Sequence, residues 1–132
     1  MANLPKKIII IEDEPDTAEM FAEMMRLSGF YVLKSYGSAT AMGMIVKERP
    51  DAVVLDVMMP DVSGLEVLQF IRRDPMLADI PVIIVSAKNM PSDIRTGLEA
   101  GATFYLTKPV AFLELRQAVE SALMTTAMQD ND

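Results

Sequence analysis

The chain predicts a doubly wound α/β fold, in which a parallel five-stranded sheet is covered by helices on both faces. Three observations predict it. Short β-branched runs alternate five times with segments whose apolar residues recur at helical spacing. The central runs are apolar on both faces, as in strands buried inside a parallel sheet. The length of 132 residues, with 51% apolar and 23% charged residues, suits one domain with a single core.

The first strand, helix and second strand follow each other directly. "KKIIII" (6–11) is β-branched and apolar on both faces, which indicates a buried strand. In "DTAEMFAEMMRLSG" (16–29) the apolar residues recur at helical spacing, and Gly29 suits a left-handed helix C-terminus. "FYVLKS" (30–35) is the next expected strand.

The central strand, "AVVLD" (52–56), is expected between two helices. The preceding helix covers about 38–47, with Ser38 as its serine cap, and an Arg-Pro pair breaks the chain after it. The following helix has Ser63 as its cap and ends near Arg73.

Two more strand and helix pairs complete the pattern. "PVIIVS" (81–86) is apolar on both faces, and the helix after it (about 92–100) ends at Gly101. "TFYLT" (103–107) is the last strand, followed by a helix over about 111–124.

The sequence indicates the domain boundaries and excludes several classes of function. We expect one domain over residues 1–124 and a disordered tail over residues 125–132. No apolar run is long enough for an export signal or a membrane span, so the expected compartment is the cytoplasm, without membrane association. The chain has no cysteine and no histidine, which excludes disulfides, zinc-thiolate sites and histidine-dependent catalysis. A net charge of −7 argues against direct nucleic-acid binding.

Polar residues stand at the carboxyl ends of four expected strands. Glu12 and Asp13 follow the first, Asp56 ends the third, Ser86 ends the fourth, and Lys108 follows the fifth. Taken singly, each has an ordinary interpretation as a turn, cap or surface residue, but in this fold class strand ends meet at one rim, where ligands bind. Three carboxylates with one lysine sum to −2, which favours a hard divalent cation, Mg²⁺ ahead of Ca²⁺. Such a metal beside a free carboxylate and an ammonium suits phosphoryl transfer.

The motifs "IIEDEPD", "LDVMMPDVSG", "VIIVSA" and "FYLTKP" together resemble the response-regulator receiver domain of two-component signalling, of the chemotaxis-receiver type. The resemblance covers about residues 6–124. It implies a flavodoxin-like sheet of strand order 2-1-3-4-5 and a domain that accepts a phosphoryl group rather than an enzyme acting on a separate substrate. The partner it implies is a histidine kinase or a phosphotransfer protein.

The resemblance also implies roles for single residues. Asp56 would accept the phosphoryl group, and Mg²⁺ would be held by Glu12, Asp13, Asp56 and the backbone carbonyl of Met58. The hydroxyl of Ser86 and the ammonium of Lys108 would bind the phosphoryl group.

Tyr105 stands where the family keeps an aromatic switch residue. Ser86 and Tyr105 would remodel a partner-binding face made by the fourth helix, fifth strand and fifth helix. Pro109 occupies a position at which the family commonly has a cis peptide bond.

Two positions depart from the pattern that would favour rapid loss of the phosphoryl group. Met58 and Lys88, each two residues after a site residue, flank the attacking water in this family, and a methionine side chain cannot orient water by hydrogen bonding. A long-lived phosphorylated form is therefore expected. The Lys88 ammonium would either stabilise the phosphoryl charge or reach into solvent, and the second interpretation is the favoured one.

Other functions that use this fold class fit the sequence less well. A dinucleotide-dependent oxidoreductase or a flavin module would need a glycine-rich phosphate loop where this chain has "EDEPDT". A haloacid-dehalogenase-like phosphatase would need an acid where Met58 stands. The strongest alternative is a receiver-like interaction module that is never phosphorylated. The sequence leaves open whether the chain is a whole protein or part of a longer one, and whether it forms a homodimer.

Overall fold

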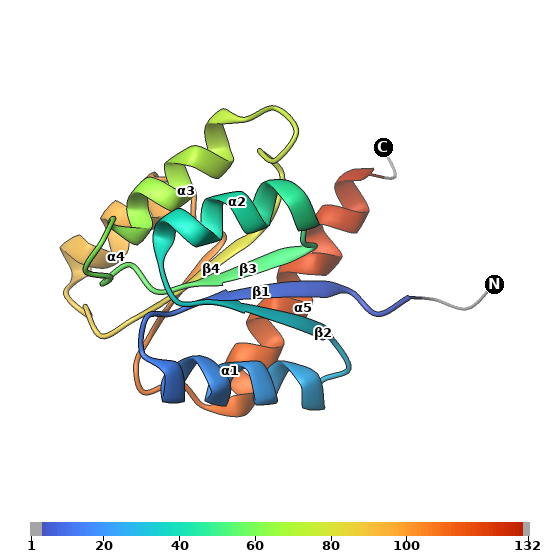
Figure 1. Cartoon of the computed structure of the whole chain (residues 1–132), viewed down its shortest axis with the longest axis horizontal. Helices are drawn as coiled ribbons and strands as arrows, with labels where there is room; N and C mark the ends of the chain where they lie inside the picture. Colours follow the sequence, from blue (N-terminus) through green and yellow to red (C-terminus); the bar gives the residue numbers. More distant parts are fainter. Residues whose placement is uncertain (1–3, 131–132) are drawn as a thin grey trace.

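The computed structural model describes residues 4–130, with side chains through residue 126. It contains five strands and five helices in strict alternation (Figure 1). The strands are β1 (Lys7–Ile11), β2 (Tyr31–Ser35), β3 (Ala52–Leu55), β4 (Val82–Ser86) and β5 (Phe104–Thr107). The helices are α1 (Pro15–Leu27), α2 (Ser38–Glu48), α3 (Gly64–Arg73), α4 (Pro91–Glu99) and α5 (Phe112–Asp130).

All neighbouring strands run parallel, in the order β2-β1-β3-β4-β5. The predicted fold class and strand order are confirmed. In the register, Ile9 of β1 lies opposite Val53 of β3, and Val54 of β3 lies opposite Ile83 of β4. Helix α1, which follows β1, packs on one face of the sheet, whereas α2, which precedes β3, packs on the other. The strand order therefore reverses between β1 and β3, and doubly wound folds bind their ligands at such a point.

The alternation of side chains along β1 divides the core into two layers. Ile8 and Ile10 pack in one core with residues of α1 and α5, whereas Ile9 and Ile11 pack in the other with residues of α2 and α3. All four isoleucines are buried, because successive side chains of a strand point to opposite faces and both faces carry helices. Figure 1 shows the two helical layers above and below the sheet.

Several local predictions hold in the structure. Gly29 follows α1 with φ +94° and Gly101 follows α4 with φ +112°, the left-handed region that glycine adopts without steric cost. Ser63 caps α3, because its side-chain oxygen accepts the backbone N–H of Leu65 at 3.2 Å. The Lys108–Pro109 peptide bond is cis.

Two local predictions are wrong. Ser38 is not the cap of α2, since Gly37 occupies that position and the buried Ser38 hydroxyl instead donates to the carbonyl of Val62. The last helix continues past Met124 to Asp130, because nothing in this polar stretch breaks a helix and two threonine hydroxyls bond to carbonyls of the preceding turn. Residues 131–132 of the predicted tail lie outside the described residues, and the division into domain and tail stays a prediction.

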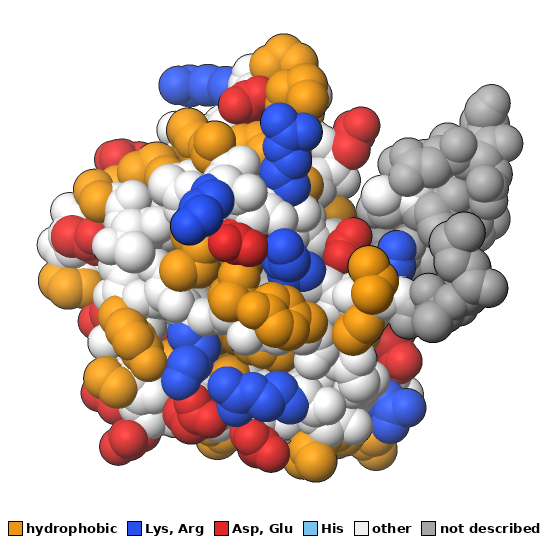
Figure 2. Space-filling model, turned by 45° about the vertical axis from the view of Figure 1, so that its right-hand side comes forward, with side chains coloured by type: hydrophobic (Ala, Val, Ile, Leu, Met, Phe, Trp, Pro, Cys, Tyr) orange, Lys and Arg blue, Asp and Glu red, His pale blue; other side chains and the backbone are white. Residues whose placement is uncertain are grey.

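The surface is mixed in charge. On the face drawn in Figure 2, acidic and basic side chains are interspersed with apolar ones. Among the described residues, no helix is both long enough and apolar enough to span a bilayer.

Candidate functional site: an acidic cluster at the strand ends

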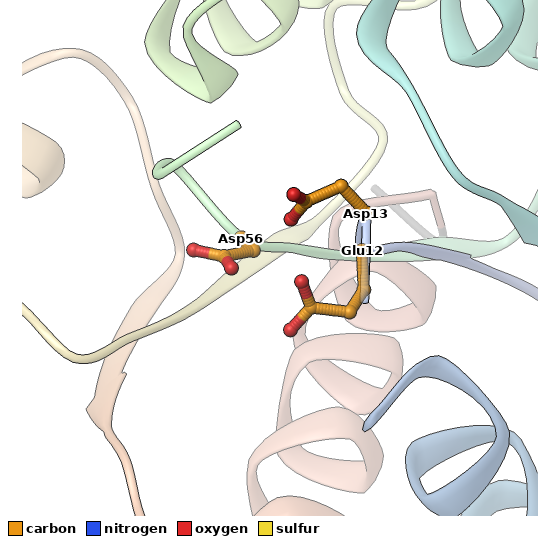
Figure 3. Close-up of side chains that lie close together, drawn as sticks. All are labelled: Glu12, Asp13 and Asp56. Atoms are coloured by element: carbon orange, nitrogen blue, oxygen red, sulfur yellow. The ribbon is translucent and has the colours of Figure 1, made fainter. Parts of the chain in front are cut away.

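Three acidic side chains meet where β1 and β3 end. A carboxylate oxygen from each of Glu12, Asp13 and Asp56 lies within 4.8 Å of the other two (Figure 3). Glu12 is only 2% exposed and Asp56 only 6% exposed, so two of the three carboxylates are nearly removed from water. The cluster predicted from the strand ends is therefore present.

The parallel register brings these acids together. The N–H of Asp56 donates to the carbonyl of Ile11 at 3.0 Å, so the pairing of β3 with β1 continues to the residue that carries the carboxylate. The N–H of Glu12 donates to Ser35 at 3.0 Å, which fixes the end of β1 against β2 in the same way. Both carboxylates thus extend from backbone that is hydrogen-bonded to the neighbouring strand.

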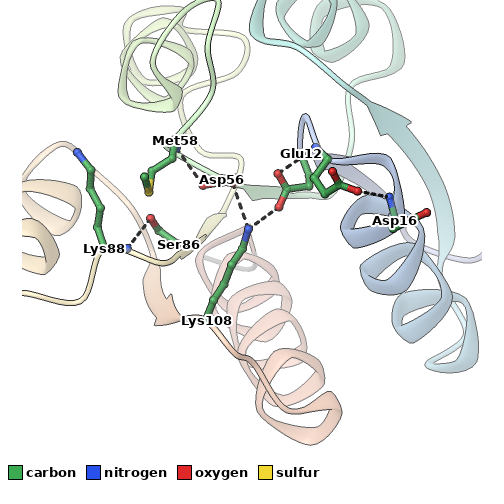
Figure 4. Close-up of polar contacts among 8 residues, drawn as sticks. Glu12, Asp16, Asp56, Met58, Ser86, Lys88 and Lys108 are labelled. Carbon is green, nitrogen blue, oxygen red and sulfur yellow. Dashed lines mark hydrogen bonds and ion pairs between the residues drawn. The ribbon is translucent and has the colours of Figure 1, made fainter.

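Lys108, which directly follows β5, completes the cluster. Its ammonium nitrogen lies 2.5 Å from Oε1 of Glu12 and 3.2 Å from Oδ2 of Asp56 (Figure 4). The backbone N–H of Lys108 donates to the carbonyl of Ser86 at 2.8 Å, so β4 holds the start of the segment that carries the lysine.

The electrostatics of the cluster favour a cation. Burial raises the pKa of Glu12 to about 7, the ion pair with Lys108 opposes this rise, and the neighbouring Asp56 adds to it. One ammonium does not neutralise three carboxylates. Oxygen ligands with a net negative charge are what hard divalent cations prefer, so the residues present fit Mg²⁺.

The loop after Asp56 is closed tightly around it. Oδ1 of Asp56 accepts the N–H of Met58 at 2.9 Å, and the N–H of Gly64 donates to the carbonyl of Val57 at 3.2 Å. A Cβ atom on Gly64 would lie 2.4 Å from the carbonyl oxygen of Asp56 and 2.6 Å from Cα of Val57. Only glycine fits there, so the loop can fold this closely against the end of β3.

The other predicted residues lie on the β4 and β5 side. Ser86 is fully buried, and its hydroxyl oxygen accepts the N–H of Lys88 at 3.1 Å. The hydroxyl of Tyr105 donates to the carbonyl of Lys88 at 2.8 Å. Both side chains therefore engage the same residue of the β4–α4 loop.

The two residues expected to control the lifetime differ in position. Met58 is 49% exposed, on the loop directly after Asp56. The exposed side chain of Lys88 points away from Asp56 in Figure 4, which agrees with the alternative that its ammonium is solvated.

Sequence reasoning missed three residues near the site. Ser38 and Asp61 join the start of α2 to the loop after Asp56. Gly97 of α4 lies against the ring of Tyr105, where an added Cβ would come within 2.7 Å of the ring. A serine, an aspartate and a glycine in such places look like ordinary cap and turn residues, so the sequence carries no signal for these contacts.

This chain is similar in sequence to known response regulators. The family model for the response regulator receiver domain matches residues 8–120. The phosphate regulon transcriptional regulatory protein PhoB of Pseudomonas aeruginosa is 35% identical over 127 residues, which are 96% of this chain and 56% of that protein. The chain spans about half the length of the curated relatives it matches.

Solved structures agree. The receiver domain of the Francisella response regulator 1452 superposes with a TM-score of 0.85 at 27% identity, over 92% of this chain and 98% of that one. A CheY-like receiver domain protein from Methanospirillum hungatei reaches a TM-score of 0.89 at 21% identity, over 96% and 99% of the two chains, a likeness that shows the fold. The family model spans most of the chain, and the chain belongs to the response regulator receiver domain family.

Proposed function

We propose that this chain accepts a phosphoryl group on Asp56 from a phosphohistidine of a histidine kinase or phosphotransfer protein, and that this changes its affinity for a downstream protein. The observation that carries the proposal is the pairing of Asp56 with Lys108 beside two further carboxylates. A purely structural ion pair would need neither the additional acids nor their position at the ends of the strands.

The residues have distinct parts in this step. An Asp56 oxygen forms the new bond to phosphorus, while the P–N bond breaks and its electron pair stays on the histidine ring, which then takes up a proton. Mg²⁺, held by Glu12, Asp13, Asp56 and the Met58 carbonyl, would offset charge on the phosphoryl oxygens. Nζ of Lys108 lies 3.2 Å from Oδ2 of Asp56, which supports the proposal that its ammonium would bind an oxygen of the transferred group.

The signal would leave through Ser86 and Tyr105. The buried Ser86 hydroxyl would bond the phosphoryl group. Its oxygen accepts the N–H of Lys88, and the Tyr105 hydroxyl donates to the carbonyl of the same residue, which supports a coupled response of the two side chains. Movement of this pair would remodel the face made by α4, β5 and α5, which is the proposed surface for the downstream partner. The phosphoryl group must bind one arrangement better than the other for this shift to occur.

The wider context remains a set of predictions. Within this chain the domain acts as a phosphoacceptor that assists its own phosphorylation and dephosphorylation, in the cytoplasm and away from membranes. The net charge of −7 supports no direct contact with nucleic acid by this chain. Homodimerisation after phosphorylation would use the same α4-β5-α5 face.

A small-molecule phosphodonor tests the proposal without the cognate kinase. The parent chain, incubated with acetyl phosphate and Mg²⁺, should gain one phosphoryl group by intact mass measurement, and Asp56→Asn should gain none. Asp79→Asn is a matched control, because Asp79 is an exposed carboxylate outside the cluster. The alternative, an interaction module that is not phosphorylated, is the conclusion if the parent stays unmodified at saturating donor and Mg²⁺.

A further inference from the structure

The loop that carries Met58 is tied to the start of α2. Oδ2 of Asp61 accepts the N–H of Ser38 at 3.0 Å. Hydrogen bonds from the backbone N–H groups of Val62, Ala39 and Ser38 lower the pKa of Asp61, so it stays ionised at neutral pH. The N-cap residue of α2 is Gly37, which has no side chain to offer, and Asp61 supplies the missing cap from another loop.

A second contact joins the same two segments in the reverse direction. The hydroxyl of Ser38 donates to the carbonyl of Val62, and its oxygen lies 3.8 Å from the sulfur of Met59. Ser38 is fully buried, so water does not compete for this bond. The β3–α3 loop is thus held at two successive residues, once through a side chain and once through a carbonyl.

The turn between β2 and α2, residues 35–38, also contacts the loop between β1 and α1, which carries Glu12 and Asp13. The hydroxyl of Ser35 donates to the carbonyl of Gly37 at 2.9 Å, and the carbonyl of Ser35 accepts the N–H of Glu12 at 3.0 Å. Ser35 is 1% exposed. One short turn therefore contacts the backbone at Glu12 on one side and the loop that follows Asp56 on the other.

We propose that Ser38 and Asp61 are positioning residues, which hold the β3–α3 loop so that the Met58 carbonyl and the carboxylates of the cluster bind Mg²⁺ together. The inference rests on the proposed function for the identity of the metal and its ligands. Neither residue belongs to the cluster, so each acts through the loop. Binding equilibria are coupled in both directions. If the bonds of Ser38 and Asp61 favour Mg²⁺ binding, then Mg²⁺ binding must favour formation of these bonds at the start of α2.

Mg²⁺ binding, followed by calorimetry on the whole chain, tests this directly. Partners that orient metal ligands typically contribute about 10- to 100-fold to affinity, so Asp61→Ala should bind Mg²⁺ about tenfold more weakly. Asp61→Asn keeps an oxygen acceptor without the charge and should recover most of the affinity. Ser38→Ala removes a hydroxyl and no charge, and should weaken binding in the same direction.

The matched control is Asp74→Ala. Asp74 accepts the N–H of Met76 at 2.9 Å in the α3–β4 loop, so the variant removes a similar bond away from the cluster, and Mg²⁺ affinity should stay at the parent value. Asp61 is exposed, so Asp61→Ala should fold, which circular dichroism checks. If Asp61→Ala and Ser38→Ala are folded and bind Mg²⁺ as the parent does, the positioning role is excluded.

Amide exchange separates this inference from the proposed function. Mg²⁺ should slow exchange at residues 38–41 in the parent and lose that effect in Asp61→Ala. At saturating Mg²⁺, phosphorylation of Asp61→Ala by acetyl phosphate should approach the parent rate, because the chemistry of Asp56 is untouched. A parent that takes up no phosphoryl group overturns the proposed function, while the Mg²⁺ and exchange measurements still decide the positioning role. Unchanged exchange at residues 38–41 in the parent overturns the positioning role.

Discussion

Two loops flank Asp56, and they are held very differently. The β3–α3 loop (56–63) is fixed by the close approach of Gly64, by the Ser63 cap and by the contacts of Asp61 and Ser38. The β4–α4 loop (87–90) is exposed throughout. Within the described residues, its backbone makes three hydrogen bonds to side chains, which are those of Ser86, Tyr105 and Asp93.

In the proposed function the two loops have different tasks. A metal site needs oxygen ligands whose positions do not change, and the backbone contacts and buried bonds of the β3–α3 loop suit that need. A switch needs an element with few stabilising contacts, so that one new bond shifts its population, and the exposed β4–α4 loop suits that need. We call the β3–α3 loop the fixed side of the site and the β4–α4 loop its adjustable side.

Among the changes to the fixed side, Gly64→Ala should reduce stability most. The new Cβ meets backbone atoms of Asp56 and Val57 at 2.4 and 2.6 Å, which no rotamer relieves, so the free energy of unfolding should fall by about 3 kcal/mol or more. Gly43→Ala is the control, because a Cβ there meets nothing within 4 Å in an exposed helix interior. It should raise stability by about 0.5 to 1 kcal/mol. Urea unfolding measures both variants, and equal effects would exclude close packing at Gly64 as the cause.

The charge of the acidic cluster, which the β3–α3 loop adjoins, should show in the pH dependence of stability. In the metal-free protein the Glu12 pKa is raised to about 7 by burial, above its ordinary value of 4.5, so the folded state binds more protons between these pH values. Stability should therefore decrease as pH rises from about 4.5 to 7, by on the order of 1 to 3 kcal/mol. Added Mg²⁺ should offset the loss near neutral pH.

Glu12→Gln sharpens this measurement. The variant keeps the shape of the side chain and removes its titration, so urea unfolding at several pH values should lose most of the slope over that range. A parent slope of the opposite sign would show that Glu12 is ionised in the metal-free fold.

The adjustable side is tested by Gly97→Ala. The added Cβ would lie 2.7 and 2.9 Å from two ring atoms of Tyr105, so we expect the ring to turn away and to lose its bond to Lys88. The helix gains about 1 kcal/mol from replacing glycine, and the lost hydrogen bond costs about as much, so global stability should change little. Amide exchange at residues 87–90 should become faster.

A double variant identifies the cause. If Gly97→Ala acts through the ring, it should add nothing to the exchange of the β4–α4 loop in a Tyr105→Ala background. An additive effect would mean that α4 itself is perturbed.

The smallest effect on stability is expected from changes to one exposed side chain in each of the two loops. Met58→Asn with Lys88→Glu changes exposed side chains and should leave the free energy of unfolding within about 0.5 kcal/mol. The polar groups should orient a water molecule behind the phosphorus and hasten loss of the phosphoryl group. Following the phosphorylated mass over time measures this, and an unchanged rate would show that these positions do not limit the lifetime.

The sequence alone determined the fold class, the order of elements and the five polar residues at the strand ends. It did so because apolar periodicity decides between strand and helix, and because parallel strands must bring their carboxyl ends to one rim. The residues Glu12, Asp13, Asp56, Ser86 and Lys108 could therefore be named from local pattern and topology.

The tertiary structure decided what depends on pairs of residues far apart in the chain. Lys108 bonds Glu12 across 96 positions, and Ser38 bonds Val62 across 24. The raised pKa of Glu12, the cap that Asp61 supplies to α2, and the contact of Gly97 with Tyr105 arise only when the packed elements meet. Local sequence specifies the conformation of each segment, whereas burial and hydrogen bonding between segments depend on distances that only the folded chain sets.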